Sequence, residues 1–403
     1  MVRQSSPQVV EQTIRCYLLL TAFYRLGISF INATYVTFLL SKGLNLFEAN
    51  LVNMVFFTTL FLFEIPTGAM ADVFGRKASF VAACSFFAIS MFLYAASETF
   101  WQFAFAEALA AIGHTFASGA FQAWLVDKLR HHGYEGSLTG IFAKEQQIMH
   151  GCSIIGAVAG AYLADVNIAL PWVGGGCVFF VTLVLALAWM KEEYFVRQPF
   201  SVAGGLVAMR DTAKTSIHYG VRHKAIRFVL LMGTAQFFAV MAPNMQWQPF
   251  FSQFIESKAT LGYIFSSMAL AMMLGAWFAP KFLARVGSER RALALTQIVI
   301  GGGIAATIAF HWLPAALGTF LIHEVGRGVW KPLKDVYLHD NIPSKERATI
   351  VSFESVTHHI GGMMGLLVSG ALAQYTSIAT AWVVSGGILV ASAMLLFKNG
   401  KEC

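Results

Sequence analysis

Ionisable side chains inside apolar segments are the residues of this 403-residue chain whose types and spacing could do chemistry. A charged group at the centre of a bilayer costs at least about 2.5 kcal/mol, so such groups rarely persist there without a role. Arg25 and Asn32 are seven positions apart and share one helical stripe, as do Glu107 and His114. Buried carboxyls and histidines can exchange protons, and arginines and amides can hold a polar or anionic ligand.

Two later apolar segments also carry polar side chains. The segment at 226–254 has amides, and the segment at 312–338 has charged residues. The candidates for substrate binding are Arg25, Asn32, Glu107, His114, Gln236, Asn244, Gln246, Trp247, His323, Glu324 and Arg327. The candidates for proton coupling are Glu107, Glu324, Glu354 and His358. For Glu354 and His358, which are four positions apart, a structural hydrogen bond between helices is an equally weighted alternative.

The elements that must position these residues are membrane helices. The chain is 57% hydrophobic and 12% charged, with a mean hydropathy of +0.63, which excludes a soluble domain of this size. Apolar runs near the length of about 20 residues that a spanning helix needs predict an all-α polytopic membrane protein with twelve transmembrane helices. The expected spans are 13–40, 46–70, 78–96, 100–128, 140–164, 168–190, 226–254, 260–284, 292–310, 312–338, 348–374 and 378–397.

A long polar, basic interruption divides the chain into halves of six spans. We expect an N-terminal bundle over residues 1–190, a cytoplasmic linker over 191–225 and a C-terminal bundle over 226–403. Lysines and arginines gather in the loops of one side, so both termini are predicted to be cytoplasmic, in a bacterial inner membrane. The same asymmetry accounts for the net charge of +7 without a nucleic-acid partner.

The polarity of the spans repeats with a period of three helices. The third, sixth, ninth and twelfth spans contain no Asp, Glu, Lys, Arg or His, whereas the first, fourth, seventh and tenth are the polar ones. A polarity that returns every third helix is what a three-helix structural repeat would give. In the fifth span, Gly156 and Gly160 form a G-x-x-x-G pair that favours close helix contact.

A short basic loop, Gly68-Ala-Met-Ala-Asp-Val-Phe-Gly-Arg-Lys77, joins the second and third spans. The pattern G-x-x-x-D-x-x-G-R-K resembles the loop at this place in the major facilitator superfamily of secondary transporters. The resemblance implies two pseudo-symmetric six-helix bundles around a central cavity that the four polar spans line. It also implies that this loop forms a gate with an acid ending the fourth span. The gate residues would be Asp72, Gly75, Arg76, Lys77 and Asp127.

The first functional hypothesis is a secondary active transporter that works by alternating access, as a proton-coupled exporter of a drug-like compound or polar metabolite. The alternative is a transporter of an organic anion, such as a carboxylate-bearing metabolite or siderophore, bound by Arg25, Arg327 and Lys331. A remote alternative is a metal-handling membrane protein that uses His323, His358, His359 and Glu354.

No enzymatic arrangement and no phosphate-binding G-x-x-x-x-G-K-[ST] loop is found in the sequence. We therefore expect no catalytic residue, cofactor or resident metal. The expected partners are a small-molecule substrate, protons and membrane lipids, and the expected state is a monomer.

Overall fold

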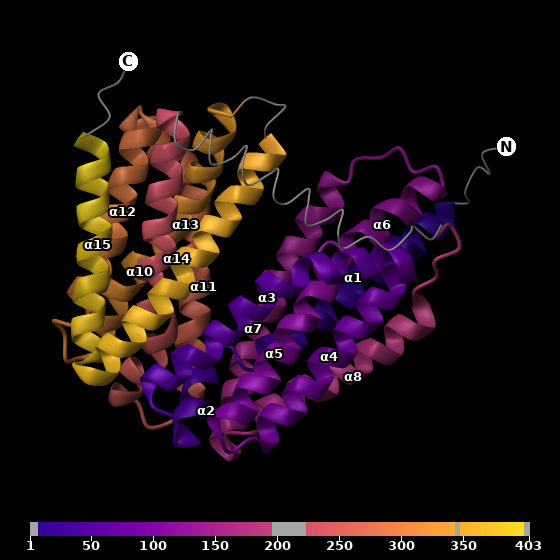
Figure 1. Ribbon diagram of the computed structural model, residues 1–403, viewed down its shortest axis with the longest axis horizontal. Helices are drawn as coiled ribbons and strands as arrows, with labels where there is room; N and C mark the ends of the chain where they lie inside the picture. Colours follow the sequence, from indigo (N-terminus) through magenta and orange to yellow (C-terminus); the bar gives the residue numbers. More distant parts are fainter. Residues whose placement is uncertain (1–6, 196–222, 343–346, 399–403) are drawn as a thin grey trace. The chain divides into compact units, whose positions relative to one another are not determined.

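The computed structural model describes residues 7–195, 223–342 and 347–398, and these ranges are helical with no strand (Figure 1). The first range contains α1 (Pro7–Ser29), α2 (Tyr35–Ser41), α3 (Leu46–Phe74), α4 (Arg76–Ala96), α5 (Phe100–Ala117), α6 (Ala120–His131), α7 (Thr139–Val166) and α8 (Leu170–Trp189). The others contain α10 (Lys224–Phe251), the 3-10 turn η1 (Ser252–Phe254), α11 (Ala259–Val286), α12 (Glu289–Thr307), α13 (Leu313–Asp340), α14 (Arg347–Tyr375) and α15 (Ile378–Lys398). The predicted all-α fold class is confirmed.

Eight of the described helices are long and apolar enough to cross a membrane by length and composition. These are α3, α4, α7, α8, α10, α11, α14 and α15. The polar residues Glu107 and His114 in α5, and Glu324 and Arg327 in α13, lower the apolar character of those two helices. The count of twelve spans stays a prediction.

Two of the predicted spans are broken. The span expected over 13–40 separates into α1 and α2 around a turn at residues 30–34, and the span expected over 100–128 separates into α5 and α6. The second break lies at Gly119, whose φ of 71° belongs to the left-handed region. Glycine occupies this region without steric penalty because it has no Cβ, and a residue in that conformation interrupts a right-handed helix.

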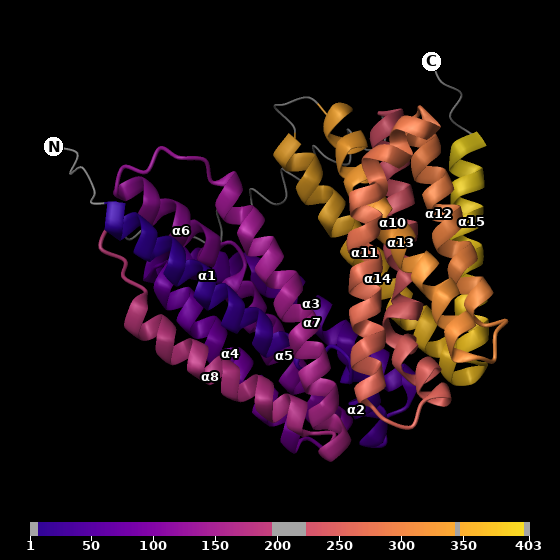
Figure 2. The ribbon, with the colours of Figure 1, turned by 180° about the vertical axis from the view of Figure 1, so that it is seen from behind.

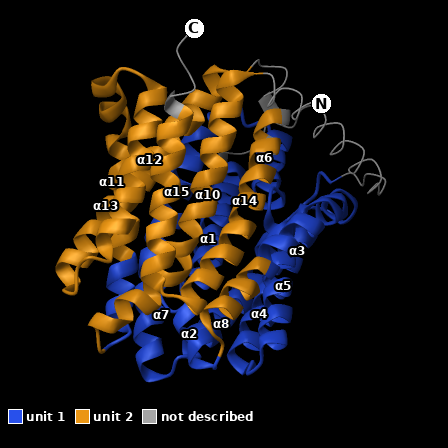
Figure 3. Cartoon of the chain, turned by 60° about the vertical axis from the view of Figure 1, so that its left-hand side comes forward, with its two compact units in different colours: residues 1–43, 55–206, 257–265 blue, residues 44–54, 207–256, 266–403 orange. Residues whose placement is uncertain are grey.

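The chain divides into two compact units (Figure 3). Unit 1 comprises residues 1–43, 55–206 and 257–265, and unit 2 comprises residues 44–54, 207–256 and 266–403. The beginning of α3 thus belongs with unit 2, and the beginning of α11 belongs with unit 1. The division into bundles at 1–190 and 226–403 stays a prediction, and residues 196–222 of the expected linker lie outside the described residues.

Stacked aromatic rings and close helix crossings hold unit 1 together. The rings of Tyr94 on α4 and Trp172 on α8 stack with their centres 3.9 Å apart. Helices α1 and α7 cross where α7 has Gly160, and a Cβ at that position would collide with the carbonyl group of Phe30. Figure 2 shows α4 beside α8 and α1 beside α7. The G-x-x-x-G pair therefore serves close helix packing, as its sequence predicts.

Unit 2 is organised around α10 and α12. Helix α10 packs against α14 and α15, and helix α12 packs against α13 and α15. Trp382 of α15 packs between two phenylalanines, with ring centres 4.6 Å from Phe250 and 5.4 Å from Phe320. A Cβ at Gly301 of α12 would lie 2.6 Å from the carbonyl oxygen of Gly386 on α15, so the backbones of α12 and α15 are in close contact. This packing places polar side chains of α10, α13 and α14 within reach of one another.

Candidate functional site

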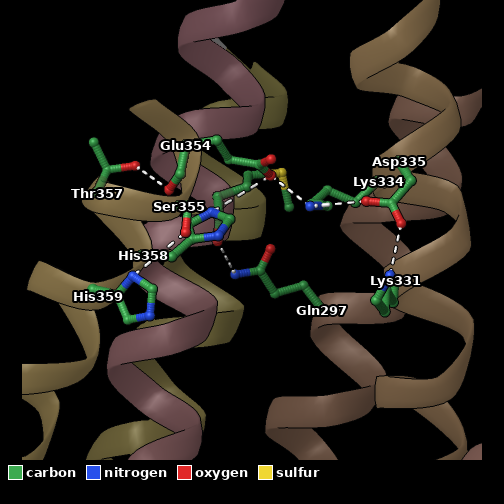
Figure 4. A network of polar contacts seen from close by, with 10 residues as sticks. Gln297, Lys331, Lys334, Asp335, Glu354, Ser355, Thr357, His358 and His359 are labelled. Atoms are coloured by element: carbon green, nitrogen blue, oxygen red, sulfur yellow. Dashed lines mark hydrogen bonds and ion pairs between the residues drawn. The ribbon is translucent and has the colours of Figure 1, made fainter. Parts of the chain in front are cut away.

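A chain of charged side chains joins α13 and α14 in unit 2 (Figure 4). The ammonium group of Lys334 on α13 lies 2.6 Å from a carboxylate oxygen of Glu354 on α14. The same group lies 2.9 Å from one oxygen of Asp335, whose other oxygen lies 2.9 Å from Nζ of Lys331. Lys334 therefore connects an acid on its own helix to an acid on the neighbouring helix.

This network runs from the interior of unit 2 to its surface. The exposed fraction of the side chain is 6% for Glu354, 14% for Lys334 and 80% for Lys331. A charge withdrawn from water is costly unless an opposite charge and hydrogen bonds compensate it. Because the Glu354 carboxylate and the Lys334 ammonium are both nearly excluded from solvent, each of these charges stabilises the other.

His358 lies one helical turn beyond Glu354 and faces the same carboxylate. Its Nε2 is 3.8 Å from the Glu354 oxygen, and it has no hydrogen-bond partner in the described part of the chain. The imidazole ring stacks on Phe237 of α10, with ring centres 4.6 Å apart. A Cβ at Gly233, one turn before Phe237, would collide with the ring. The absence of a side chain at Gly233 therefore leaves the space on α10 that the imidazole ring occupies. A small movement would bring His358 and Glu354 into hydrogen-bond contact.

A second polar cluster joins α13 to α10. The guanidinium group of Arg327 donates hydrogen bonds of 3.0 Å to the amide oxygen of Asn244 and to the carboxylate of Glu324. The Glu324 side chain is buried, and Nε2 of the buried His323 lies 3.7 Å from its carboxylate. On its other side the His323 ring meets the Ile300 carbonyl oxygen at 3.2 Å. The sequence candidates Asn244, His323, Glu324 and Arg327 are thus brought together.

The two clusters share one face of α13. Arg327, Lys331 and Lys334 follow one another at spacings of four and three residues, which places their side chains on the same side of a helix. At a rise of 1.5 Å per residue, the seven residues from Arg327 to Lys334 correspond to about 10 Å along the axis. Glu354 and His358 therefore belong to the same polar surface as the Arg327 cluster, although they come from α14.

The remaining candidates on α10 are packed inside unit 2. Gln246 is fully buried and donates a 3.0 Å hydrogen bond to the carbonyl oxygen of Ser369 on α14. Gln236 is also buried, and its amide oxygen has no hydrogen-bond partner among the described residues. Trp247 is buried as well. Asn244 is the candidate on this helix that hydrogen-bonds Arg327.

In unit 1, Glu107 is held by an aromatic pocket. Its carboxylate accepts a hydrogen bond from the hydroxyl group of Tyr94, which stacks on Trp172. The rings of Phe38 and Phe103 pack around the same two aromatic residues. Tyr94 was missed by sequence reasoning, because tyrosines in apolar helices are common and no spacing connects this one to Glu107.

The other unit 1 candidates lie on α1, on the turn after it and on α5. Arg25 is half-buried on α1 and forms no ion pair within the described ranges. Asn32 donates a 3.3 Å hydrogen bond to Ser153 on α7. His114 is exposed, and its ring lies 5.8 Å from that of Phe56. The shared cavity site expected for these candidates stays a prediction.

In the structure, residues 68–74 of the predicted basic loop form the end of α3, and Arg76 and Lys77 begin α4. Gly75 separates the two helices with a φ of 98°, a conformation that other residues rarely adopt. The guanidinium group of Arg76 lies 3.1 Å from the Asp72 carboxylate, one turn earlier. The Lys77 ammonium donates a 2.8 Å hydrogen bond to the carbonyl oxygen of Leu187 on α8.

Glu192, which follows α8, caps the N-terminus of α4. Its two carboxylate oxygens accept hydrogen bonds from the backbone amides of Arg76 at 2.7 Å and Lys77 at 3.0 Å. A carboxylate is well suited to this place because the first amides of a helix lack partners and carry partial positive charge. Sequence reasoning missed this contact. The available signal was an acidic pair, Glu192 and Glu193, directly after the sixth span.

Asp127, the fifth gate candidate, is half-buried on α6 and forms no ion pair with Arg76 or Lys77 in the described ranges. The pKa of the Tyr194 hydroxyl is raised, first by burial and then by the negative charge of Glu192. The negative charge of Asp127 raises it further. The role of the five gate residues stays a prediction.

No group of three or more histidine, cysteine, aspartate or glutamate side chains comes together as a metal site within residues 7–195, 223–342 and 347–398. The four residues of the metal-handling hypothesis are divided between the two clusters. His323 contacts the Ile300 carbonyl group, and Nδ1 of His359 lies 3.5 Å from the Ser355 hydroxyl group.

Comparison with known proteins identifies the family. The sequence profile of the Major Facilitator Superfamily matches residues 17–353 and 228–402. The chain belongs to this superfamily. The protein is therefore a membrane transporter rather than an enzyme, and the family resemblance of the loop at 68–77 is confirmed.

Two curated superfamily members are similar along much of the chain. The uncharacterized MFS-type transporter YxaM of Bacillus subtilis (strain 168) is 22% identical over 370 residues, which cover 90% of each protein. A multi-drug resistance efflux pump PmrA homolog of Lactococcus lactis subsp. lactis (strain IL1403) is 26% identical over 263 residues. That match covers 62% of this chain and 61% of the relative.

Solved superfamily structures share the fold. The nucleoside transporter NupG superposes with a TM-score of 0.75 at 14% identity, covering 96% of this chain and all of that one. A bacterial homologue of the iron transporter ferroportin, in its inward-facing state, gives 0.71 at 15% identity, covering 96% of this chain and 98% of that one. At such identities the similarity establishes the fold of this superfamily member and leaves its substrate open.

Proposed function

We propose that this superfamily member is a proton-coupled exporter of a drug-like or polar small molecule, and that Glu354 carries the coupling proton. In this proposal the protein is a monomer in a bacterial inner membrane, with both termini in the cytoplasm. The observation that carries the proposal is the buried contact among Lys334, Glu354 and His358.

The contact has the properties that a proton-driven switch requires. A proton on Glu354 would remove the negative charge that holds Lys334 at 2.6 Å, while Asp335 would remain as the partner of the lysine. His358 lies 3.8 Å from the same carboxylate, close enough to accept or deliver that proton after a small movement. The charge state of Glu354 would therefore decide how α13 and α14 are joined.

The second cluster supports a role in substrate recognition. Arg327 is 20% exposed and presents a guanidinium group beside the amide of Asn244. Its charge is balanced by the buried Glu324, so a polar ligand that takes the place of the Asn244 amide leaves the Arg327–Glu324 ion pair intact and creates no bare charge. The name of the Lactococcus relative supports export, because that protein is an efflux pump homolog.

The test is drug efflux from liposomes with an imposed pH gradient, with ethidium as the probe. Glu354→Gln should abolish gradient-driven ethidium movement while ethidium binding to the purified protein stays within about twofold of the original. Glu98→Gln is the matched control, because that acid is exposed and forms an ion pair with Lys42 in unit 1, whereas the network belongs to unit 2. Full gradient-driven transport in Glu354→Gln would overturn the coupling proposal.

An organic anion is the second candidate substrate, and Arg25 favours it. This half-buried arginine has no ion pair in the described ranges, so its charge is available to a carboxylate or phosphate. Under this alternative, Arg25→Gln should weaken binding of a dicarboxylate such as succinate, while ethidium binding stays unchanged. Absence of any saturable anion binding to the original protein would exclude it.

A further inference from the structure

An apolar groove opens on the surface of unit 2 between α11, α12 and α13. Its volume is about 490 Å³, and its walls consist almost entirely of apolar atoms. The lining residues include Leu270, Leu274, Phe278, Val299, Leu321 and Val325. Leu270, Leu274 and Val299 are exposed, so the groove is accessible from outside the unit.

The groove faces away from the charged network. Val325 and Val329 line it, and each lies two residues from Arg327 on the same helix. Two residues correspond to a rotation of about 200°, so their side chains lie on nearly the opposite side of α13 from the guanidinium group. In a membrane transporter, an exposed apolar face turned away from the polar surface contacts acyl chains.

Positive charges lie at one end of this groove. The guanidinium group of Arg285 lies 5.9 Å from the ring centre of Phe278, which is itself a lining residue. One turn earlier, the Lys281 ammonium lies 3.9 Å from the ring centre of Trp277. Neither cation has an ion-pair partner among the residues that the structure describes. An exposed tryptophan beside basic residues is typical of the level of lipid headgroups.

The length of the groove suits one lipid chain. Along α11 the lining runs from Ser267 to Phe282, fifteen residues or about 22 Å at 1.5 Å per residue. One leaflet contributes about half of the roughly 30 Å hydrocarbon core of a bilayer. An acyl chain that begins at the basic end can therefore lie in the groove over the whole depth of its leaflet.

We propose that the groove is a binding site for an anionic phospholipid. One acyl chain lies between α11, α12 and α13, and the phosphate group contacts Lys281 and Arg285. The apolar walls select an acyl chain, and the two cations select a negative headgroup over a zwitterionic one. This inference depends on the membrane location of the protein and is independent of proton coupling and of the transported substrate.

Two kinds of variant separate the contributions of chain and headgroup. Gly318 lines the groove, and a Cβ there would meet no atom within 4 Å, so Gly318→Leu fills the groove without a clash. Gly387→Leu on α15 is the matched control, since the space beside that glycine is equally open. The double variant Lys281→Gln/Arg285→Gln removes the cations, and Arg130→Gln, at an exposed position on α6, controls for loss of charge.

The experiment is a lipid titration of the delipidated, full-length protein followed by native mass spectrometry, with phosphatidylglycerol and phosphatidylcholine as probes. The original protein should retain phosphatidylglycerol preferentially. The charge variant should bind it about 25-fold more weakly, since each basic residue contributes roughly a factor of five, and should lose the preference. Gly318→Leu should lose one bound lipid of either kind, unlike Gly387→Leu.

Equal retention of the two lipids by the original protein would overturn the proposal, as would an unchanged phosphatidylglycerol affinity in the charge variant. A Gly318→Leu protein that retains as many lipids as Gly387→Leu would exclude the groove as the site of the chain. Circular dichroism of each variant confirms that helix content is maintained. If Gly318→Leu fails to fold, the charge variant alone decides the outcome.

Discussion

The Lys334–Glu354 contact makes a quantitative prediction about stability. Lys334→Met keeps the length of the side chain but leaves the Glu354 carboxylate 6% exposed and without its partner at 2.6 Å. Loss of one partner of a buried ion pair costs about 3–5 kcal/mol, because the remaining charge is uncompensated. We expect about 3 kcal/mol here, at the lower end, since the 14% exposure of Lys334 lets water screen part of the charge.

The double variant Lys334→Met/Glu354→Met should recover most of that loss. Replacement of both charges by apolar side chains leaves no bare charge and is often neutral or stabilising by about 1–4 kcal/mol. Asp335 would keep Lys331 as its partner at 2.9 Å. The two single variants and the double variant should therefore be strongly non-additive, with a coupling energy above about 1 kcal/mol.

The assay is reversible unfolding of the purified protein in mixed micelles with increasing dodecyl sulfate, which yields a free energy of unfolding for each variant. Lys331→Met serves as the control, since that side chain is 80% exposed and its surface pair should contribute only about 0–1 kcal/mol. Additivity within about 0.5 kcal/mol would refute the reasoning. So would a Lys334→Met variant as stable as Lys331→Met.

Three further predictions concern single contacts. Glu192→Gln should lower the free energy of unfolding by about 1 kcal/mol, because the charge that caps α4 is lost, whereas Glu193→Gln should have little effect in the same titration. Gly233→Ala should reduce gradient-driven transport and thermal stability by displacing the His358 ring, and adding His358→Ala should restore the stability. A double variant as unstable as Gly233→Ala would show that the His358 ring does not depend on the space beside Gly233. Burial lowers the pKa of His132, and the charges of His131 and Lys128 lower it further. The unfolded chain therefore binds a proton at this histidine more readily than the folded protein does. Stability should fall as pH drops below the ordinary histidine range, and less so in His132→Gln; an identical acid dependence of the melting temperature in both proteins would contradict this.

The helices themselves were largely predictable from the order of apolar and polar residues. The segment expected over 168–190 is α8 (Leu170–Trp189), and the one expected over 78–96 is α4 (Arg76–Ala96). A membrane helix satisfies its own backbone hydrogen bonds, so a continuous apolar run is sufficient to predict it. The breaks at residues 30–34 and at Gly119 were not predictable in this way, because they interrupt runs that remain apolar.

Partners of the charged residues were harder to predict. The depth of Glu107 in an apolar run was enough to predict that it is buried. Its hydrogen-bond partner is Tyr94, however, and not the oppositely charged Arg25. Glu354 and Lys334 are twenty positions apart on different helices, and no sequence spacing relates them. The contact depends on how α13 and α14 are rotated about their axes, which is decided by close crossings elsewhere in unit 2.

The sequence by itself determined the class of this protein: its apolar runs require helices in a membrane, and the loop from Gly68 to Lys77 indicates the transporter superfamily to which it belongs. It also identified which side chains are too costly to leave in lipid without a partner. Only the tertiary structure decided which partner each of them has. The physical reason is that burial of a charge is a property of its position along one helix, whereas compensation of that charge depends on a second helix brought beside it by packing.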